Sequence, residues 1–155
     1  MSCVVGFKII ARSISWVAVE GTQSCPAYVE HHRDFVPEGR EPEDLLAEWV
    51  EPVFTNVINR LKPARIAYML TLPQQGKNPS FDHIRRVYYP LGLLAFMAHK
   101  DDIPVACESL KGKPFGLRKL HEVEAHVRSL LGDYSTHWDR EMLHAAAAAI
   151  LRLPQ

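Results

Sequence analysis

Hydrophobic residues at the start of the chain follow the pattern of two strands joined by a short turn. Residues 3–8 and 13–19 are apolar for most of their length, as expected for strands buried in a sheet. A third strand is predicted over 27–35, where the alternation is weaker and Pro26 and Pro37 lie at its edges. The first part of the chain therefore predicts a β-hairpin followed by a further strand.

The next segment has the spacing of a helix with one buried face. From Pro42 to Leu61, apolar residues recur every three or four positions, which predicts a helix packed on the sheet. Pro42 suits the first turn of this helix, whereas Pro52 lies inside it and lacks a backbone donor. We therefore expect a kink or a break at Pro52.

Strand-like and helix-like segments alternate in the rest of the chain. Strands are predicted over 66–72 and 103–107, and helices over 81–98, 117–131 and 139–152. Ser80 is a plausible N-cap, and Pro90 predicts a bend. A hairpin followed by strand–helix alternation implies an α/β protein with a mixed sheet and helices on its faces. This is the layout of a ribonuclease H-like five-stranded sheet, while flavodoxin-like and other α/β layouts stay open on pattern alone.

Composition limits the class of protein. With 155 residues, 47% of them hydrophobic, the chain has the size of a single domain over 1–155. Its three cysteines lie far apart, which fits neither a disulfide framework nor a C-x-x-C metal site. No apolar run reaches 18 residues without interruption. We therefore expect a soluble, cytoplasmic protein with no membrane partner.

Charge is balanced overall but not along the chain. Eighteen basic and eighteen acidic side chains give a net charge of zero, so nothing attracts the whole molecule to nucleic acid. Residues 77–119, however, contain eight Lys and Arg against four acids. Two interpretations of this stretch stay open: its cations contact a DNA backbone, or they are ordinary solvated side chains. The candidate nucleic-acid-binding residues in it are Lys77, Lys111, Lys113, Arg118 and Lys119.

Several short motifs occur together in a characteristic order. They are Leu61-Lys62-Pro63-Ala64-Arg65-Ile66-Ala67, then Gly76-Lys77-Asn78, Gly116-Leu117-Arg118-Lys119 before Val127-Arg128-Ser129-Leu130-Leu131, and an alanine-rich last helix. In this order, and with the hairpin at the start, the chain resembles the RuvC-type Holliday-junction resolvases over nearly its whole length. The resemblance implies the ribonuclease H-like fold.

The resemblance also implies a site. Enzymes of this family hold two divalent ions with four acidic side chains, and the ions activate a water and stabilise the leaving oxygen of a phosphodiester. In this sequence the four positions fall on Lys8, Met69, Glu141 and His144. Only one of these four residues carries a carboxylate. The family also has an aromatic wedge residue a few positions after the second of them, and this position falls near Leu72. Two interpretations of Lys8 stay open. It is either an internal cation that pairs with Glu141 or a surface residue at the end of a strand.

These substitutions predict a catalytically inactive RuvC-like domain without a metal site or cofactor. We expect it to act as a DNA-associated binding or scaffolding protein for branched or duplex DNA. The helix over 81–98 matches the element through which resolvases of this family pair, so a homodimer or a protein partner is expected. The alternative is a structure-selective endonuclease that uses Mg²⁺ at a site rebuilt from Asp139, Glu141 and His144. DNA binding without cutting, through the basic stretch, is a third possibility.

Overall fold

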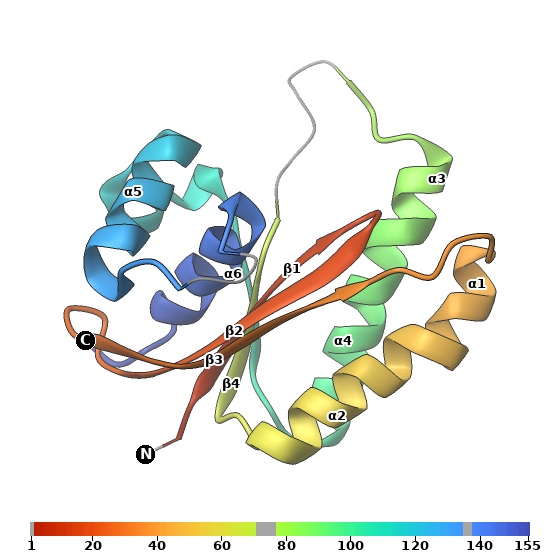
Figure 1. Cartoon of the computed structure of the whole chain (residues 1–155), viewed down its shortest axis with the longest axis horizontal. Coiled ribbons are helices and arrows are strands. Elements are labelled where there is room, and N and C mark those ends of the chain that lie inside the picture. Colours follow the sequence, from red (N-terminus) through yellow and green to blue (C-terminus); the bar gives the residue numbers. More distant parts are fainter. Residues whose placement is uncertain (1, 71–76, 135–137) are drawn as a thin grey trace.

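A mixed five-stranded sheet with helices on both faces forms the molecule in the computed structural model, which describes residues 2–70, 77–134 and 138–155 (Figure 1). The strands are β1 (Val4–Ile10), β2 (Ser13–Gly21), β3 (Pro26–Phe35), β4 (Arg65–Met69) and β5 (Val105–Glu108). Their order across the sheet is β3-β2-β1-β4-β5. The first three strands pair antiparallel, whereas β4 and β5 run parallel to β1. The predicted mixed sheet is therefore confirmed.

The predicted strands differ from the observed ones at their ends. The strand expected over 66–72 begins at Arg65, and the described part of it ends at Met69, because residues 71–76 lie outside the described residues. Leu72, the position of the expected wedge, falls in that range. β5 begins only after Pro104, whose carbonyl accepts a hydrogen bond of 2.9 Å from the amide of Ile66. Pro104 thus joins the sheet through the one backbone group it can offer.

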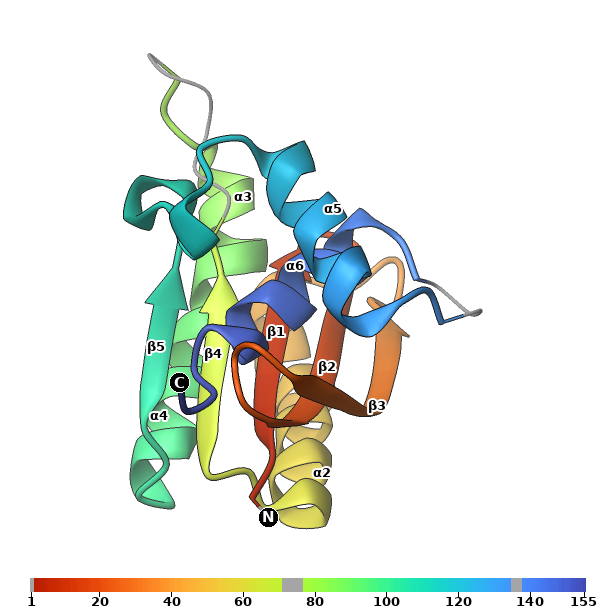
Figure 2. The ribbon, with the colours of Figure 1, turned by 90° about the vertical axis from the view of Figure 1, so that its left-hand side faces the viewer.

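Two layers of helices cover the sheet (Figure 2). On one face lie α1 (Pro42–Leu45), α2 (Glu51–Leu61), α3 (Phe81–His83) and α4 (Tyr89–Lys100), and on the other lie α5 (Leu120–Leu131) and α6 (Arg140–Ile150). Two short 3₁₀ turns, η3 (Leu110–Gly112) and η4 (Pro114–Gly116), connect β5 to α5. Within the described ranges, no helix has the length and apolar character needed to cross a bilayer.

The two prolines for which the sequence predicts a helix break each follow a π-helical segment. Pro52 lies in the first turn of α2, directly after η1 (Leu46–Val50), and Pro90 lies in the first turn of α4, after η2 (Ile84–Tyr88). Proline lacks the donor for the helical hydrogen bond and crowds the preceding turn, and a π-helical turn is wider than an α-helical one. The breaks expected from the sequence therefore occur as local changes of helix type.

The alternation of β1 divides the core into two parts. Val5, Phe7 and Ile9 pack toward α2 and α4, where Phe7 meets the ring of Phe54 edge-on at 5.5 Å between centroids. The other side of β1 faces α6. A Cβ on Gly6 would lie 1.9 Å from the carbonyl oxygen of Ala145, so glycine lets α6 pack directly on the strand. This close contact brings the start of α6 to the carboxyl end of β1.

Candidate functional site

The structure brings Lys8 and Met69 together at the carboxyl ends of β1 and β4. The Lys8 side chain lies on the α6 side of the sheet, and the residue is only 5% exposed. Its Nζ donates to the backbone oxygen of Met69 over 3.5 Å. Glu141, in the first turn of α6, is close enough to Lys8 to attract its charge. An ammonium group therefore lies inside the predicted site.

Burial makes this ammonium group easier to deprotonate. Removal from water lowers the pKa of Lys8 from 10.5 to about 8, the attraction of Glu141 opposes the change, and the positive charge of Arg140 adds to it. The carboxylate thus compensates only part of the cost of burying the charge.

A second cation, Arg33, lies in the same row across the sheet. Lys8 pairs with Ser15 in β2, and Ser15 pairs with Arg33 in β3. The Arg33 Nε donates to the Ser15 Oγ at 2.9 Å, and its two terminal nitrogens donate to the two carboxylate oxygens of Asp139 at 2.7 and 2.5 Å. Such a bidentate pair fixes both partners.

Asp139 also caps α6. Its Oδ1 accepts from the amide of Met142 at 3.3 Å, which satisfies a free donor at the helix start. Burial works against ionisation of this carboxyl group, but the hydrogen bonds from Arg33 and Met142 outweigh it and hold the pKa of Asp139 below its usual range. Arg33 thereby links the edge strand to the beginning of α6.

His144 lies one turn further along α6 and is 2% exposed. Its Nε2 is 2.9 Å from Oε1 of Glu124 in α5, and its Nδ1 has no hydrogen-bond partner among the described residues. Burial is the main reason that the pKa of His144 is lowered, while the bond to Glu124 opposes it and the nearby charge of Lys8 strengthens it. Near neutral pH the imidazole is therefore uncharged, with Nε2–H donating to Glu124.

The four positions taken from the family resemblance thus lie close together, and three further residues complete the network. Arg33, Ser15 and Glu124 were not among the predicted site residues. Arg33 lies in a strand with weak alternation, and its partner Asp139 is 106 positions away in the sequence. The sequence shows Arg33 only as an arginine in a predicted strand. This does not identify a site residue unless the contact with Asp139 is known.

The side chains present do not fit a centre of two ions held by four carboxylates. The corresponding positions carry an ammonium group, a thioether, one carboxylate and an imidazole. Within residues 2–70, 77–134 and 138–155, no group of three or more His, Cys, Asp or Glu side chains is arranged to hold a metal ion. The side chains at these four positions therefore differ from the set of metal ligands that the family resemblance implies.

The predicted nucleic-acid-binding residues follow β4 and β5 along the chain, with Lys77 after β4 and the other four between β5 and α5. All five side chains (Lys77, Lys111, Lys113, Arg118 and Lys119) are exposed, and none forms an ion pair with another described residue. Arg85 and Arg86 differ, because Arg85 binds Glu43 and Glu41 and Arg86 binds Asp82. The basic stretch thus separates into five solvated cations, two arginines held in ion pairs, and Lys100, whose Nζ lies 5.7 Å from the centre of the Phe96 ring.

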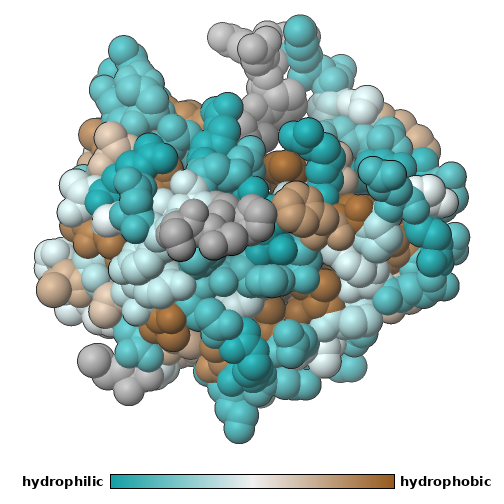
Figure 3. Space-filling view, in the orientation of Figure 1, coloured by the Kyte–Doolittle hydropathy of each residue, from teal (hydrophilic) through white to brown (hydrophobic). Residues whose placement is uncertain are grey.

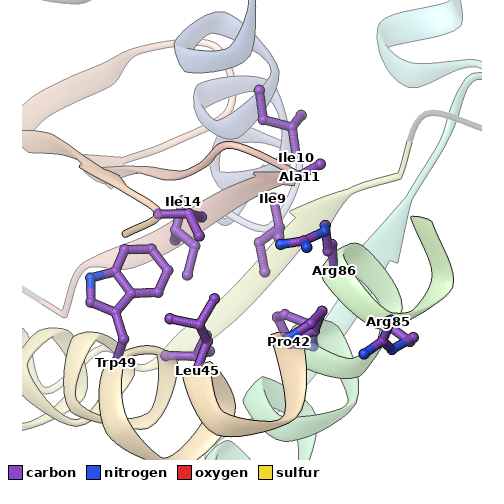
Figure 4. A pocket seen from close by; sticks show the side chains of 12 residues that line it. Ile9, Ile10, Ala11, Ile14, Pro42, Leu45, Trp49, Arg85 and Arg86 are labelled. Carbon is purple, nitrogen blue, oxygen red and sulfur yellow. The ribbon is translucent and has the colours of Figure 1, made fainter. Parts of the chain in front are cut away.

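An apolar pocket lies on the other face of the sheet, between the β1–β2 hairpin and α1 (Figure 4). Ile9, Ile14 and Leu45 are among the residues that line it, with Arg86 beside it. The pocket offers about 20 Å³ to a water-sized molecule, which is room for about one or two waters. It is too small for an organic ligand.

The sheet order, the helices on both faces and the site at the carboxyl ends of β1 and β4 define a ribonuclease H-like α/β fold of the RuvC resolvase type. Thermus thermophilus RuvC in complex with a Holliday junction substrate superposes with a TM-score of 0.77 at 15% identity, covering 97% of this chain and 92% of that chain. The yeast mitochondrial Holliday junction resolvase Ydc2 superposes with a TM-score of 0.68 at 14% sequence identity, and the match covers 97% of this chain and 77% of that chain. Fowlpox virus resolvase, solved with Holliday junction DNA, superposes with a TM-score of 0.59 at 8% sequence identity, and the match covers 96% of this chain and 94% of that chain.

No family model matches the chain, and a comparison with curated protein sequences finds no match. The structural likenesses correct one expectation. The sequence predicts no cofactor, but the neighbours are Holliday junction resolvases, for which the family resemblance implies divalent cations. The prediction of no cofactor is therefore wrong, and a divalent cation belongs in every activity test of this chain.

Proposed function

We propose that this chain is a RuvC-like domain that binds branched or duplex DNA at the carboxyl end of its sheet and has lost the family's two-ion cleavage. The observation that supports the loss of cleavage is the pair of cations, Lys8 and Arg33, set among the carboxylates of Glu141 and Asp139. A fixed cation beside a carboxylate reduces the negative charge that would attract a divalent ion.

DNA binding rests on the fold and on the five solvated cations. Two of the structural neighbours were solved with Holliday junction DNA, which supports this class of ligand. Lys111, Lys113, Arg118 and Lys119 lie within nine residues of one another on either side of η4, so they present a compact basic surface to a phosphate backbone.

A nuclease rebuilt on Asp139, Glu141 and His144 is not favoured by the contacts of these residues. Both carboxylate oxygens of Asp139 accept from Arg33, and the Nε2 of His144 is engaged with Glu124. Recruiting them as metal ligands would leave the nearly buried Arg33 without its partner, which costs free energy.

The test measures binding and cutting of a four-way junction and of the matching duplex, each with Mg²⁺, with Mn²⁺ and with EDTA. We expect binding that weakens with salt, and intact DNA strands under all three conditions. Lys111→Gln with Lys113→Gln should lower the slope of log affinity against log salt by about 0.9 per lost phosphate contact.

Lys62→Gln is the matched control, because Lys62 is exposed between α2 and β4 at the opposite end of the sheet. Metal-dependent strand cutting that disappears in Glu141→Ala would replace this proposal with the nuclease. A chain that binds neither DNA at low salt would refute DNA binding altogether.

A further inference from the structure

A groove runs between β3 and the helical segment formed by η1 and α2, on the sheet face opposite α6. Every second residue of β3, namely Glu30, His32 and Asp34, lines one side. The helical side contributes residues about four positions apart, among them Trp49 and Arg60. This β3–α2 groove has a volume of about 410 Å³ and is open to solvent, a size in the range of peptide side-chain and ligand sites.

The groove combines acidic and aromatic side chains. Glu30, Asp34 and Glu48 contribute three carboxylates, whereas Arg60 is the one Lys or Arg among its described lining residues. Trp16 and Trp49 supply two indole rings. Carboxylates beside aromatic faces are the surroundings that bind guanidinium and ammonium groups.

Within the protein itself, the guanidinium group of Arg60 is bound in this way. Its guanidinium carbon lies 5.6 Å from the centre of the Trp16 ring, and its Nη1 donates to Glu30 at 2.6 Å. One end of the groove thus already holds a cation between an indole and a carboxylate. Further along, the ionic partners of Asp34 and Glu48 among the described residues are His32 and the partly exposed Arg40.

Trp16, one of the two tryptophans that line the groove, has an unsatisfied donor inside the protein. Trp16 is 2% exposed, and its Nε1 has no hydrogen-bond partner among the described residues. A buried N–H group without an acceptor costs about 1–3 kcal/mol. Because the Nε1 atom has almost no accessible surface, an occupant of the groove meets the carboxylates and Trp49 rather than this donor.

β3 is also an edge of the sheet, since the strand order begins with it. The outer backbone groups of an edge strand can pair with an added extended segment, and side chains on alternate positions of that segment then point to one face. Figure 3 shows this side of the molecule with hydrophobic residues in small separate areas among hydrophilic ones. A polar occupant therefore fits better than an apolar one.

We propose that the β3–α2 groove binds an extended segment of a partner protein that carries lysine or arginine at alternate positions. The main chain of the segment pairs with the edge of β3, and its cations meet Asp34, Glu48 and the ring of Trp49. This surface goes beyond DNA binding, because its acidic character disfavours a phosphate backbone. The candidate DNA surface follows β5, at the other edge of the sheet.

The experiment uses the full chain and an eight-residue peptide of alternating arginine and threonine, with a peptide of alternating glutamate and threonine for comparison. Binding is measured by calorimetry at 50 and 150 mM salt. We expect the basic peptide alone to bind, and Asp34→Asn with Glu48→Gln to weaken it about tenfold or more. Glu38→Gln with Asp44→Asn is the matched control, because both residues are exposed and lie outside the groove.

Retained junction affinity in the Asp34 and Glu48 variant would separate this surface from the DNA surface. Equal binding of both peptides, no binding of either, or undiminished binding by the variant would overturn the proposal. Spermine that displaces the peptide with equal affinity would assign the groove to small polycations instead. Self-association that the same variant abolishes would assign it to a second copy of the chain.

Discussion

At the scale of single residues, Lys8 has the largest consequence for the site. Its ammonium group is 5% exposed, and its pKa of about 8 shows that Glu141 does not repay the cost of burial. The folded chain therefore holds this proton less tightly than the unfolded chain, for which the pKa is 10.5. A positive charge at this position is maintained at the expense of stability at neutral pH.

Replacing Lys8 with Met should stabilise the protein at pH 7. The difference between pKa values of about 8 and 10.5 corresponds to about 3 kcal/mol, an upper bound because the methionine must still pack. Between these values the unfolded state binds more protons, so the stability of the wild type rises with pH and its deficit relative to Lys8→Met shrinks. Urea unfolding of both proteins from pH 7 to 10 measures this.

Lys62→Met is the control, and it should show no comparable gain, since Lys62 is already exposed. A destabilised Lys8→Met protein would show instead that the contacts of Lys8 with Met69 and Glu141 outweigh its desolvation.

Arg33 and Asp139 should behave as a coupled pair. Asp139→Asn keeps an oxygen for the amide of Met142 but removes the charge facing Arg33, and we expect a loss of about 1–2 kcal/mol, limited because the Asp139 side chain is 47% exposed. The same change in an Arg33→Gln background should cost much less. A double-mutant cycle measured by urea unfolding checks this, and additive effects would contradict the pairing.

At the scale of elements, the position of α6 depends on Gly6. Because a Cβ at this residue would meet the carbonyl oxygen of Ala145 at 1.9 Å, Gly6→Ala should displace α6 and cost about 3 kcal/mol or more. Gly92→Ala is the matched control, since it lies in α4 with nothing within 4 Å of the added Cβ. There alanine should stabilise the helix by about 1 kcal/mol.

Thermal and urea unfolding would show opposite signs for the two changes. If both variants were equally stable, the direct packing of α6 on β1 would be wrong.

The elements were predicted well because their signals are local. Runs of apolar residues predicted β1 and β2. Apolar residues three or four positions apart predicted the helices, and Pro52 and Pro90 predicted the breaks in them. The π-helical segments before these prolines were not predicted, since they depend on how each helix adapts to its packing. β4 begins one residue earlier than predicted, and β5 begins two residues later and ends one residue later, for the same reason.

The site was predictable only in part. The family resemblance selected Lys8, Met69, Glu141 and His144, which the structure places at the carboxyl ends of β1 and β4 and the start of α6. It could not supply the bond of Arg33 to Asp139 or that of Glu124 to His144, because these join segments 106 and 20 positions apart. Such pairings are set by the tertiary structure, and a single sequence does not reveal them.

At the scale of the whole molecule, three surfaces with different chemistry lie on different parts of the protein. Solvated cations follow β4 and β5, acidic and aromatic groups lie between β3 and α2, and aromatic side chains are exposed on α4. On α4, Phe96 is 60% and Tyr89 is 39% exposed, with Gly92 between them. Aromatic groups at this spacing share one face of the helix.

We propose that the homodimer expected from the sequence forms through this face of α4. Large exposed aromatic residues around a glycine allow two helices to approach closely and bury apolar surface. Sedimentation of the wild type should show a concentration-dependent dimer, and Tyr89→Glu with Phe96→Glu should shift it to monomer without loss of stability, because both side chains are exposed in the single chain.

Phe35→Glu is the matched control for this prediction, since Phe35 is also 60% exposed but lies at the end of β3. If the α4 face forms the dimer, the Phe35 variant stays dimeric. A wild type that remains monomeric at high concentration would remove the dimer. DNA binding would then depend on the cations of one chain alone, and its salt dependence would show about half as many phosphate contacts.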